Sequence, residues 1–168
     1  KAKEVNNGFV LSLKNLTDVL AGVWTEIYQH FGVATIFGEN FITLRKERAT
    51  KKETLEIDLK NAPDIAQTIA VTCFSENIAC NLVGLHTLKI KETDRLEALK
   101  EELTNLGANI SVTDKSLHLK ISSKINSNVA IKTYKDHRMA MAFAPLALKV
   151  PIKILEAEVV TKSYQKFW

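Results

Sequence analysis

Residues 90–96 read Ile-Lys-Glu-Thr-Asp-Arg-Leu, and they lead into leucines at helical spacing, at Leu96, Leu99, Leu103 and Leu106. This pattern predicts a helix over 94–106, with Thr93 as its N-cap and Asp94 in its first turn. The positive charge of Arg95 is unfavourable near the positive end of the helix dipole, unless an anion lies at the helix start. We therefore interpret Lys91 to Arg95 as an anion-binding corner that carries its own carboxylate.

The predicted elements on either side of this corner repeat in one order: helix, hairpin, strand, helix, strand. The first copy comprises a helix over 20–31, strands over 33–37, 41–45 and 54–59, a helix over 65–75 and a strand over 79–85. The second comprises the helix over 94–106, strands over 109–112, 116–121 and 129–133, a helix from 136 to 148 and strand material over 150–160. Such a repeat indicates an internal duplication, in which helices are buried under successive sheets.

No linker of Gly, Ser or Pro separates the two copies. We therefore expect one repeat-built domain over residues 1–168, with units 1–90 and 91–168. The chain opens with Lys1-Ala2-Lys3 and without an initiator Met, which suggests a piece of a longer protein.

The composition limits the class of protein and of partner. Hydrophobic residues make up 46% and charged residues 25%, as in an ordinary globular protein. A net charge of +4 permits an anionic partner, and a small phosphorylated metabolite fits it at least as well as nucleic acid. The densest basic cluster, residues 45–52, lacks the aromatic spacing of a nucleic-acid platform, so we expect no nucleic-acid partner.

The cysteines and the hydropathy of the chain indicate the cellular location that we expect. Cys73 and Cys80 fit neither a CxxC motif nor a disulfide framework, so we expect reduced core residues and a cytoplasmic location. No uninterrupted apolar run is long enough to span a bilayer and no signal peptide is present, so we expect no membrane partner.

Four cations fall at predicted element boundaries: Lys91, Arg95, Arg138 and Lys162. The sequence Asp136-His137-Arg138 mirrors the first corner, since a capping carboxylate again precedes a cation in an opening turn. Two helices that both tolerate a first-turn arginine suggest one shared anionic ligand. The alternative is that each cation is a solvated surface charge.

Each remaining candidate also has two interpretations. Asp64 either caps its helix or accepts a proton from a substrate hydroxyl. Glu92 either forms a local ion pair or acts in proton transfer, and His137 either donates to a phosphate or packs. The other histidines have no metal-ligand spacing, so we expect no metal site.

Four motifs together resemble the 5-enolpyruvylshikimate-3-phosphate synthase family, in order and in spacing. They are 62–64 (Ala-Pro-Asp), 91–95 (Lys-Glu-Thr-Asp-Arg), 136–142 (Asp-His-Arg-Met-Ala-Met-Ala) and 160–164 (Val-Thr-Lys-Ser-Tyr). The resemblance runs from about residue 20 to the end. The motif at 91–95 separates this family from its sibling that acts on UDP-N-acetylglucosamine.

The resemblance implies an α+β fold of repeated βαβαββ units, with helices packed under mixed four-stranded sheets. It implies transfer of the carboxyvinyl group of phosphoenolpyruvate to the 5-hydroxyl of shikimate 3-phosphate, in aromatic amino-acid biosynthesis, without metal or organic cofactor. The chain resembles part of the C-terminal domain. The N-terminal domain of the same enzyme would then be its partner, and the fragment alone is expected to be inactive.

By position in the motifs, the resemblance assigns roles to seven residues. The proposed catalytic residues are Asp64, Glu92 and Lys162, and the proposed substrate-binding residues are Lys91, Arg95, His137 and Arg138. Asp64 would take the proton of the 5-hydroxyl, and Glu92 would deliver a proton to the methylene carbon of phosphoenolpyruvate and later retrieve one. Lys91 would contact shikimate 3-phosphate, while Arg95, Arg138 and Lys162 would clamp phosphoenolpyruvate.

The chain also departs from the family pattern, at Ala21, Val23, Thr87 and Gln165. Ala21 and Val23 replace polar members of a loop, which favours an alternative function, a non-catalytic anion-binding module on the same fold. The alternative is disfavoured by the intact set of site residues, namely Asp64, Lys91, Glu92, Arg95, Arg138 and Lys162. A basic nucleic-acid-binding domain and the sibling transferase are the remaining alternatives.

Overall fold

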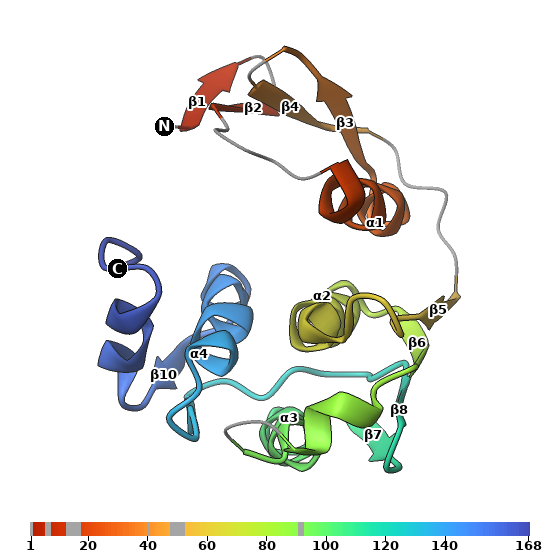
Figure 1. Ribbon diagram of the computed structural model, residues 1–168. Helices are drawn as coiled ribbons and strands as arrows, with labels where there is room; N and C mark the ends of the chain where they lie inside the picture. The colour runs from red at the N-terminus through yellow and green to blue at the C-terminus, as the bar shows by residue number, and fades with distance from the viewer. Residues whose placement is uncertain (1, 6–7, 13–17, 40, 48–52, 91–92) are drawn as a thin grey trace. The chain divides into compact units, whose positions relative to one another are not determined.

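The computed structural model describes residues 2–5, 8–12, 18–39, 41–47, 53–90 and 93–168 (Figure 1). Within these ranges, side chains are described from residue 22 onward. The chain divides into two compact units, Lys1–Lys52 and Glu53–Trp168. The predicted division into repeat units at 90/91 stays a prediction.

The first unit is a four-stranded antiparallel sheet with one helix, α1 (Asp18–Gln29), packed against β3. The strands are β1 (Ala2–Val5), β2 (Gly8–Ser12), β3 (Val33–Phe37) and β4 (Phe41–Lys46), in the order β1-β2-β4-β3. The predicted helix and hairpin are confirmed. The chain leaves α1 through Gly32, whose φ of 75° lies in the left-handed region that glycine adopts without strain.

The second unit contains one complete βαβαββ arrangement. Its elements are β5 (Thr54–Asp58), η1 (Pro63–Ile65), α2 (Ala66–Glu76), β6 (Ala79–Val83), η2 (His86–Ile90), α3 (Arg95–Asn105), β7 (Asn109–Val112) and β8 (Ser116–Lys120). The sheet order is β5-β6-β8-β7, with β5 parallel to β6 and the other pairs antiparallel. The expected mixed four-stranded sheet is therefore confirmed.

The next strand-helix-strand segment repeats the start of this arrangement. It comprises β9 (Val129–Ile131), α4 (His137–Phe143), η3 (Ala144–Leu148) and β10 (Ile152–Ile154), and β10 pairs parallel with β9 as β6 does with β5. The predicted helix over 136–148 changes from α to 3-10 geometry at Ala144, because Pro145 has no amide to donate to the preceding turn.

The prediction of strand material over 150–160 is partly wrong. The strand ends at Ile154, and Glu156 turns the chain with a φ of 50° into the 3-10 helix η4 (Ala157–Lys162). Val160 is buried, and η4 packs against α4. The burial of Val160 explains the apolar pattern from which the sequence predicts a strand.

The core of the second unit lies between the helices and one face of its sheet (Figure 1). Alternate strand residues on that face are buried, namely Leu55, Cys80, Leu82, Leu117 and Leu119. Cys73 on α2 and Cys80 on β6 are both buried and free, as predicted for reduced core residues. Their mutual hydrogen bond and burial raise the pKa of Cys73, so its thiol stays protonated.

No described helix is long and apolar enough to cross a membrane, and no three described His, Cys, Asp or Glu side chains are grouped to hold a metal ion.

Leu103→Ala should lower the free energy of unfolding by about 2–5 kcal/mol, because it removes apolar contacts and leaves a cavity where the side chain is 0% exposed. Urea unfolding followed by circular dichroism measures this. Leu148→Ala is the matched control, since Leu148 is 91% exposed, and it should change stability by no more than about 0.5 kcal/mol. Equal effects of the two substitutions would contradict the described core.

Candidate functional site

The start of α3 is capped by Asp94. Its Oδ1 accepts hydrogen bonds from the backbone amides of Leu96 and Glu97, both at 3.2 Å. The prediction of Thr93 as the N-cap is therefore wrong by one residue, because the carboxylate of the extended Asp94 already satisfies these two amides. Lys91 and Glu92 lie outside the described residues, so their predicted roles stay predictions.

Arg95 is the most deeply buried cation of the described chain, with 0% of its surface exposed. Its Nε donates to Oδ2 of Asp136 at 2.5 Å, and its Nη1 donates to Oδ1 of Asp64 at 2.9 Å. The charge that offsets a first-turn arginine is thus supplied, in this structure, by two carboxylates from other elements. Binding of an external anion by Arg95 stays a prediction.

Asp136 joins the starts of two helices. Its Oδ1 accepts from the backbone amide of Arg138 at 2.8 Å, which caps α4 as predicted, while Oδ2 binds Arg95 of α3. The side chain is fully buried, so both oxygens use protein donors in place of water. Asp136 therefore fixes α4 relative to α3 at the end where the candidate residues lie.

Asp64 does not cap its helix. The N-cap position of η1 is Ala62, and no side chain caps either η1 or α2, so the capping interpretation is wrong. Its two oxygens lie 2.9 Å from Nη1 of Arg95 and 3.6 Å from Nη2 of Arg138. Because its side chain is 43% exposed, Asp64 is held by two cations and still reaches solvent.

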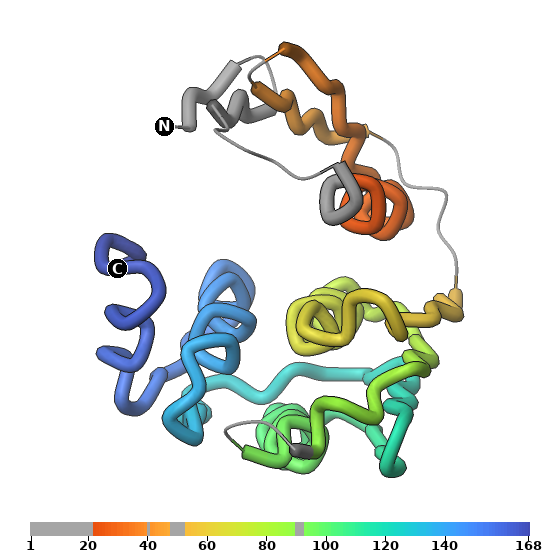
Figure 2. Tube along the Cα trace, viewed as in Figure 1, coloured from red at the N-terminus to blue at the C-terminus, as the bar shows by residue number. Residues whose placement is uncertain are grey.

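The starts of η1, α3 and α4 therefore lie side by side, although they are far apart in the sequence (Figure 2). Arg138 remains 34% exposed, and His137 lies beside it with Nδ1 4.0 Å from Oδ1 of Asp136. Lys162 lies exposed on η4, which packs against α4, and it forms no ion pair with any residue in the described ranges. The structure thus brings together Asp64, Arg95 and Arg138, with His137 adjacent, and leaves Lys162 unconnected to them.

A family model described as EPSP synthase (3-phosphoshikimate 1-carboxyvinyltransferase) matches residues 11–168. The chain belongs to the EPSP synthase family. The 3-phosphoshikimate 1-carboxyvinyltransferase of Bacteroides fragilis is 44% identical over 146 residues, which cover 85% of this chain and 35% of that protein. The enzyme of the same name from Neisseria meningitidis is 28% identical over 141 residues, covering 83% of this chain and 33% of that protein. The chain thus spans about a third of the length of these curated relatives.

Two solved structures share the fold. An EPSP synthase from Acinetobacter baumannii superposes with a TM-score of 0.73 at 21% identity, covering 93% of this chain and 39% of that one. The enolpyruvyl transferase NikO from Streptomyces tendae gives 0.57 at 15% identity, covering 87% of this chain and 33% of that one. The expected α+β enolpyruvyl transferase fold is therefore confirmed.

Sequence reasoning missed one contact of the candidate site. Asp136 was identified only as a cap, although its second oxygen neutralises Arg95. The signal was present in the repeat, because equivalent helix starts carry an acid one or two residues before an arginine and therefore offer two complementary pairs. The pairing itself is a tertiary contact between α3 and α4, which spacing along the chain does not specify.

Asp136→Ala should lower the free energy of unfolding by about 3–5 kcal/mol, because it leaves the Arg95 guanidinium buried with one carboxylate removed. Denaturant titration of the chain measures the change. Glu97→Gln is the control, since its i,i+3 pair with Lys100 is exposed and should matter little. Similar small effects of both substitutions would show that the buried pair does not hold the helix starts.

Proposed function

We propose that the protein carrying this chain transfers the carboxyvinyl group of phosphoenolpyruvate to the 5-hydroxyl of shikimate 3-phosphate and releases phosphate. The observation that carries the proposal is the meeting of Asp64, Arg95 and Arg138 from three separate elements. Membership of the EPSP synthase family supports the same reaction. The chain spans about a third of its relatives, so the activity is proposed for the longer enzyme and not for this segment alone.

The reaction needs a base and a proton donor near two anions. Asp64 takes the proton of the 5-hydroxyl as its oxygen attacks C2 of phosphoenolpyruvate, and Glu92 protonates the methylene carbon. The tetrahedral adduct then loses phosphate while Glu92 retrieves a proton from the same carbon, which restores the double bond. Fixed carboxylates stabilise the cationic character that develops when the enol carbon is protonated.

The cations hold two mutually repelling substrates in contact. The side chain of Arg138 is partly exposed and that of Lys162 is exposed, so both are suited to bind phosphoenolpyruvate directly. Arg95 has no exposed surface in this structure, so binding of that substrate to Arg95 requires exchange of one of its present contacts or opening of the chain around it. Because both anions are held in place, the reacting atoms are already positioned, and the step no longer depends on a bimolecular encounter in solution.

The proposal includes partners and a location. Lys91 and His137 bind substrate oxygens, and the N-terminal domain of the same enzyme contributes the rest of the site. The reaction serves aromatic amino-acid biosynthesis in the cytoplasm, a reducing compartment that fits the two free cysteines. The alternative is a non-catalytic anion-binding module on the same fold, and it predicts binding of both substrates without turnover.

Asp64→Ala or Glu92→Ala in the full-length protein should lower kcat by about 10²–10⁴-fold, because each removes a group that moves a proton. The KM values should change little, since neither carboxylate is proposed to hold a substrate. Release of phosphate from the two substrates measures the rate.

Asp114→Ala is the control for loss of a carboxylate, because Asp114 is exposed and pairs only with Lys89 among the described residues. The Asp114→Ala enzyme should have the same kcat as the parent enzyme. Near-normal turnover of the Asp64 or Glu92 variant would reject the assigned role. An inactive parent enzyme that still binds both substrates would favour the anion-binding module.

A further inference from the structure

Helix α3 buries a second charge on the face that carries Arg95. Glu102 lies about two turns further along the helix, and like Arg95 it is 0% exposed. Burying a carboxylate is costly unless protein donors replace its water. Two opposite charges buried on one helical face therefore indicate a specific partner for each.

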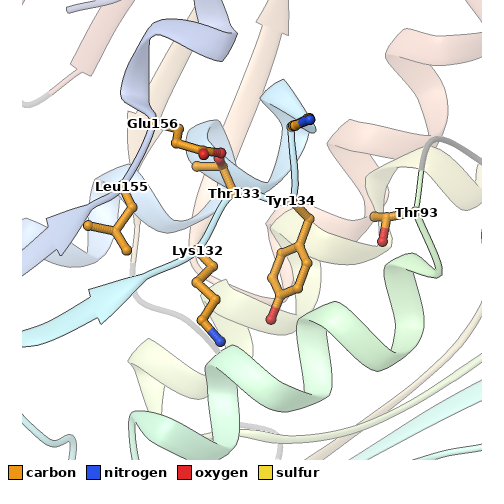
Figure 3. A pocket seen from close by; sticks show the side chains of 7 residues that line it. Thr93, Lys132, Thr133, Tyr134, Leu155 and Glu156 are labelled. Atoms are coloured by element: carbon orange, nitrogen blue, oxygen red, sulfur yellow. The ribbon is translucent and has the colours of Figure 1, made fainter.

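Both oxygens of Glu102 bind the segment that leads into α4. The hydroxyl of Tyr134 donates to Oε1 at 2.7 Å, and the backbone amide of Lys132 donates to Oε2 at 3.2 Å. Figure 3 shows the Tyr134 ring directed toward α3. The same segment ends at Asp136, which binds Arg95, so α3 holds residues 132–136 at two points with charges of opposite sign.

The backbone between these two points is strained. Tyr134 and Lys135 have φ values of 54° and 58°, in the left-handed region that residues with a Cβ rarely adopt. Such conformations persist only where surrounding contacts impose them. The turn reverses the chain so that Asp136 points back to Arg95.

The amide of Asp136 donates to the carbonyl of Thr133 at 2.9 Å and closes the turn, but the remaining polar side-chain contacts of this turn are weak. A cavity of about 440 Å³ lies against it, so packing does not hold it from that side (Figure 3). The cavity is lined by Thr93, Lys132, Thr133, Tyr134, Lys135, Leu155 and Glu156. The ion pair of Lys132 with Glu101 is exposed, and the hydroxyl of Thr133 has no partner among the described residues. Burial and the bond to Glu102 raise the pKa of Tyr134, so its hydroxyl stays a donor.

We propose that Glu102 and Tyr134 are positioning residues, which hold the strained turn so that Asp136 meets Arg95 and Arg138 faces phosphoenolpyruvate. The statement that Arg138 faces phosphoenolpyruvate rests on the proposed function. Neither residue touches substrate in this account. They act through Asp136, which caps α4 and thereby sets the direction of Arg138.

The first test measures the contact between Arg95 and Asp136 and does not depend on enzyme activity. In the ¹⁵N-labelled chain, the Nε proton of Arg95 is protected by its buried bond to Asp136. Tyr134→Phe removes one hydroxyl and should raise the solvent-exchange rate of that proton by about tenfold or more, measured by NMR. Glu97→Gln is the matched control, since Glu97 is exposed on the same helix and pairs with Lys100, outside the 132–136 segment, and it should leave the rate unchanged.

An unchanged exchange rate in Tyr134→Phe would overturn the proposal. If that variant does not fold, Glu102→Asp keeps the charge and withdraws the carboxylate by one methylene, and the same rise is expected. Failure of both variants to fold would also overturn it, because the contact would then hold the whole unit and not the turn.

The second test uses kinetics of the full-length protein. Tyr134→Phe should raise the KM for phosphoenolpyruvate by about tenfold and leave the KM for shikimate 3-phosphate unchanged. A merely structural role would reduce the amount of folded enzyme and lower apparent kcat, with both KM values unchanged, and that result would overturn the proposal. If the parent enzyme shows no turnover, the proposed function fails while the exchange measurement still decides the positioning role.

Discussion

The buried ion pair between Arg95 and Asp136 is the contact on which the candidate site depends. A guanidinium with no exposed surface is tolerated only because carboxylates replace its water, and those carboxylates come from η1 and α4. Through Asp136 and Asp64, Arg95 therefore links three elements at one end of the second unit. Asp136 also caps α4 and so positions Arg138. Glu102, about two turns further along α3, binds Tyr134 in the segment that leads to Asp136.

Much of the fold was predictable because it follows from local patterns. Alternating apolar residues gave strands such as β5 and β8, and leucines at helical spacing gave α3. The order of elements in the repeat is also confirmed, since each copy carries its own pattern. The errors lie where one contact changes the outcome: Asp94 caps α3 in place of Thr93, and the chain turns at Glu156 into a 3-10 helix.

The sequence predicted which residues lie in the candidate site better than it predicted how they contact one another. Motif positions indicated Asp64, Arg95 and Arg138, and these do meet. The sequence did not specify that carboxylates of the chain itself would surround Arg95, because the pairing depends on how α3 and α4 pack. Glu102 carried a signal that went unused, since it falls on the leucine stripe of α3, where a solvated glutamate is not expected.

The central claim is that the starts of η1, α3 and α4 meet around one anionic substrate, with an acid beside it to move a proton. A crystal structure of the full-length protein with the enolpyruvyl product and phosphate tests this most directly. The account predicts the Asp64 carboxylate within hydrogen-bond distance of the oxygen that was the 5-hydroxyl, and an anionic group of the ligands on Arg138. Ligands bound elsewhere, with Asp64 and Arg138 facing away from them, would contradict it.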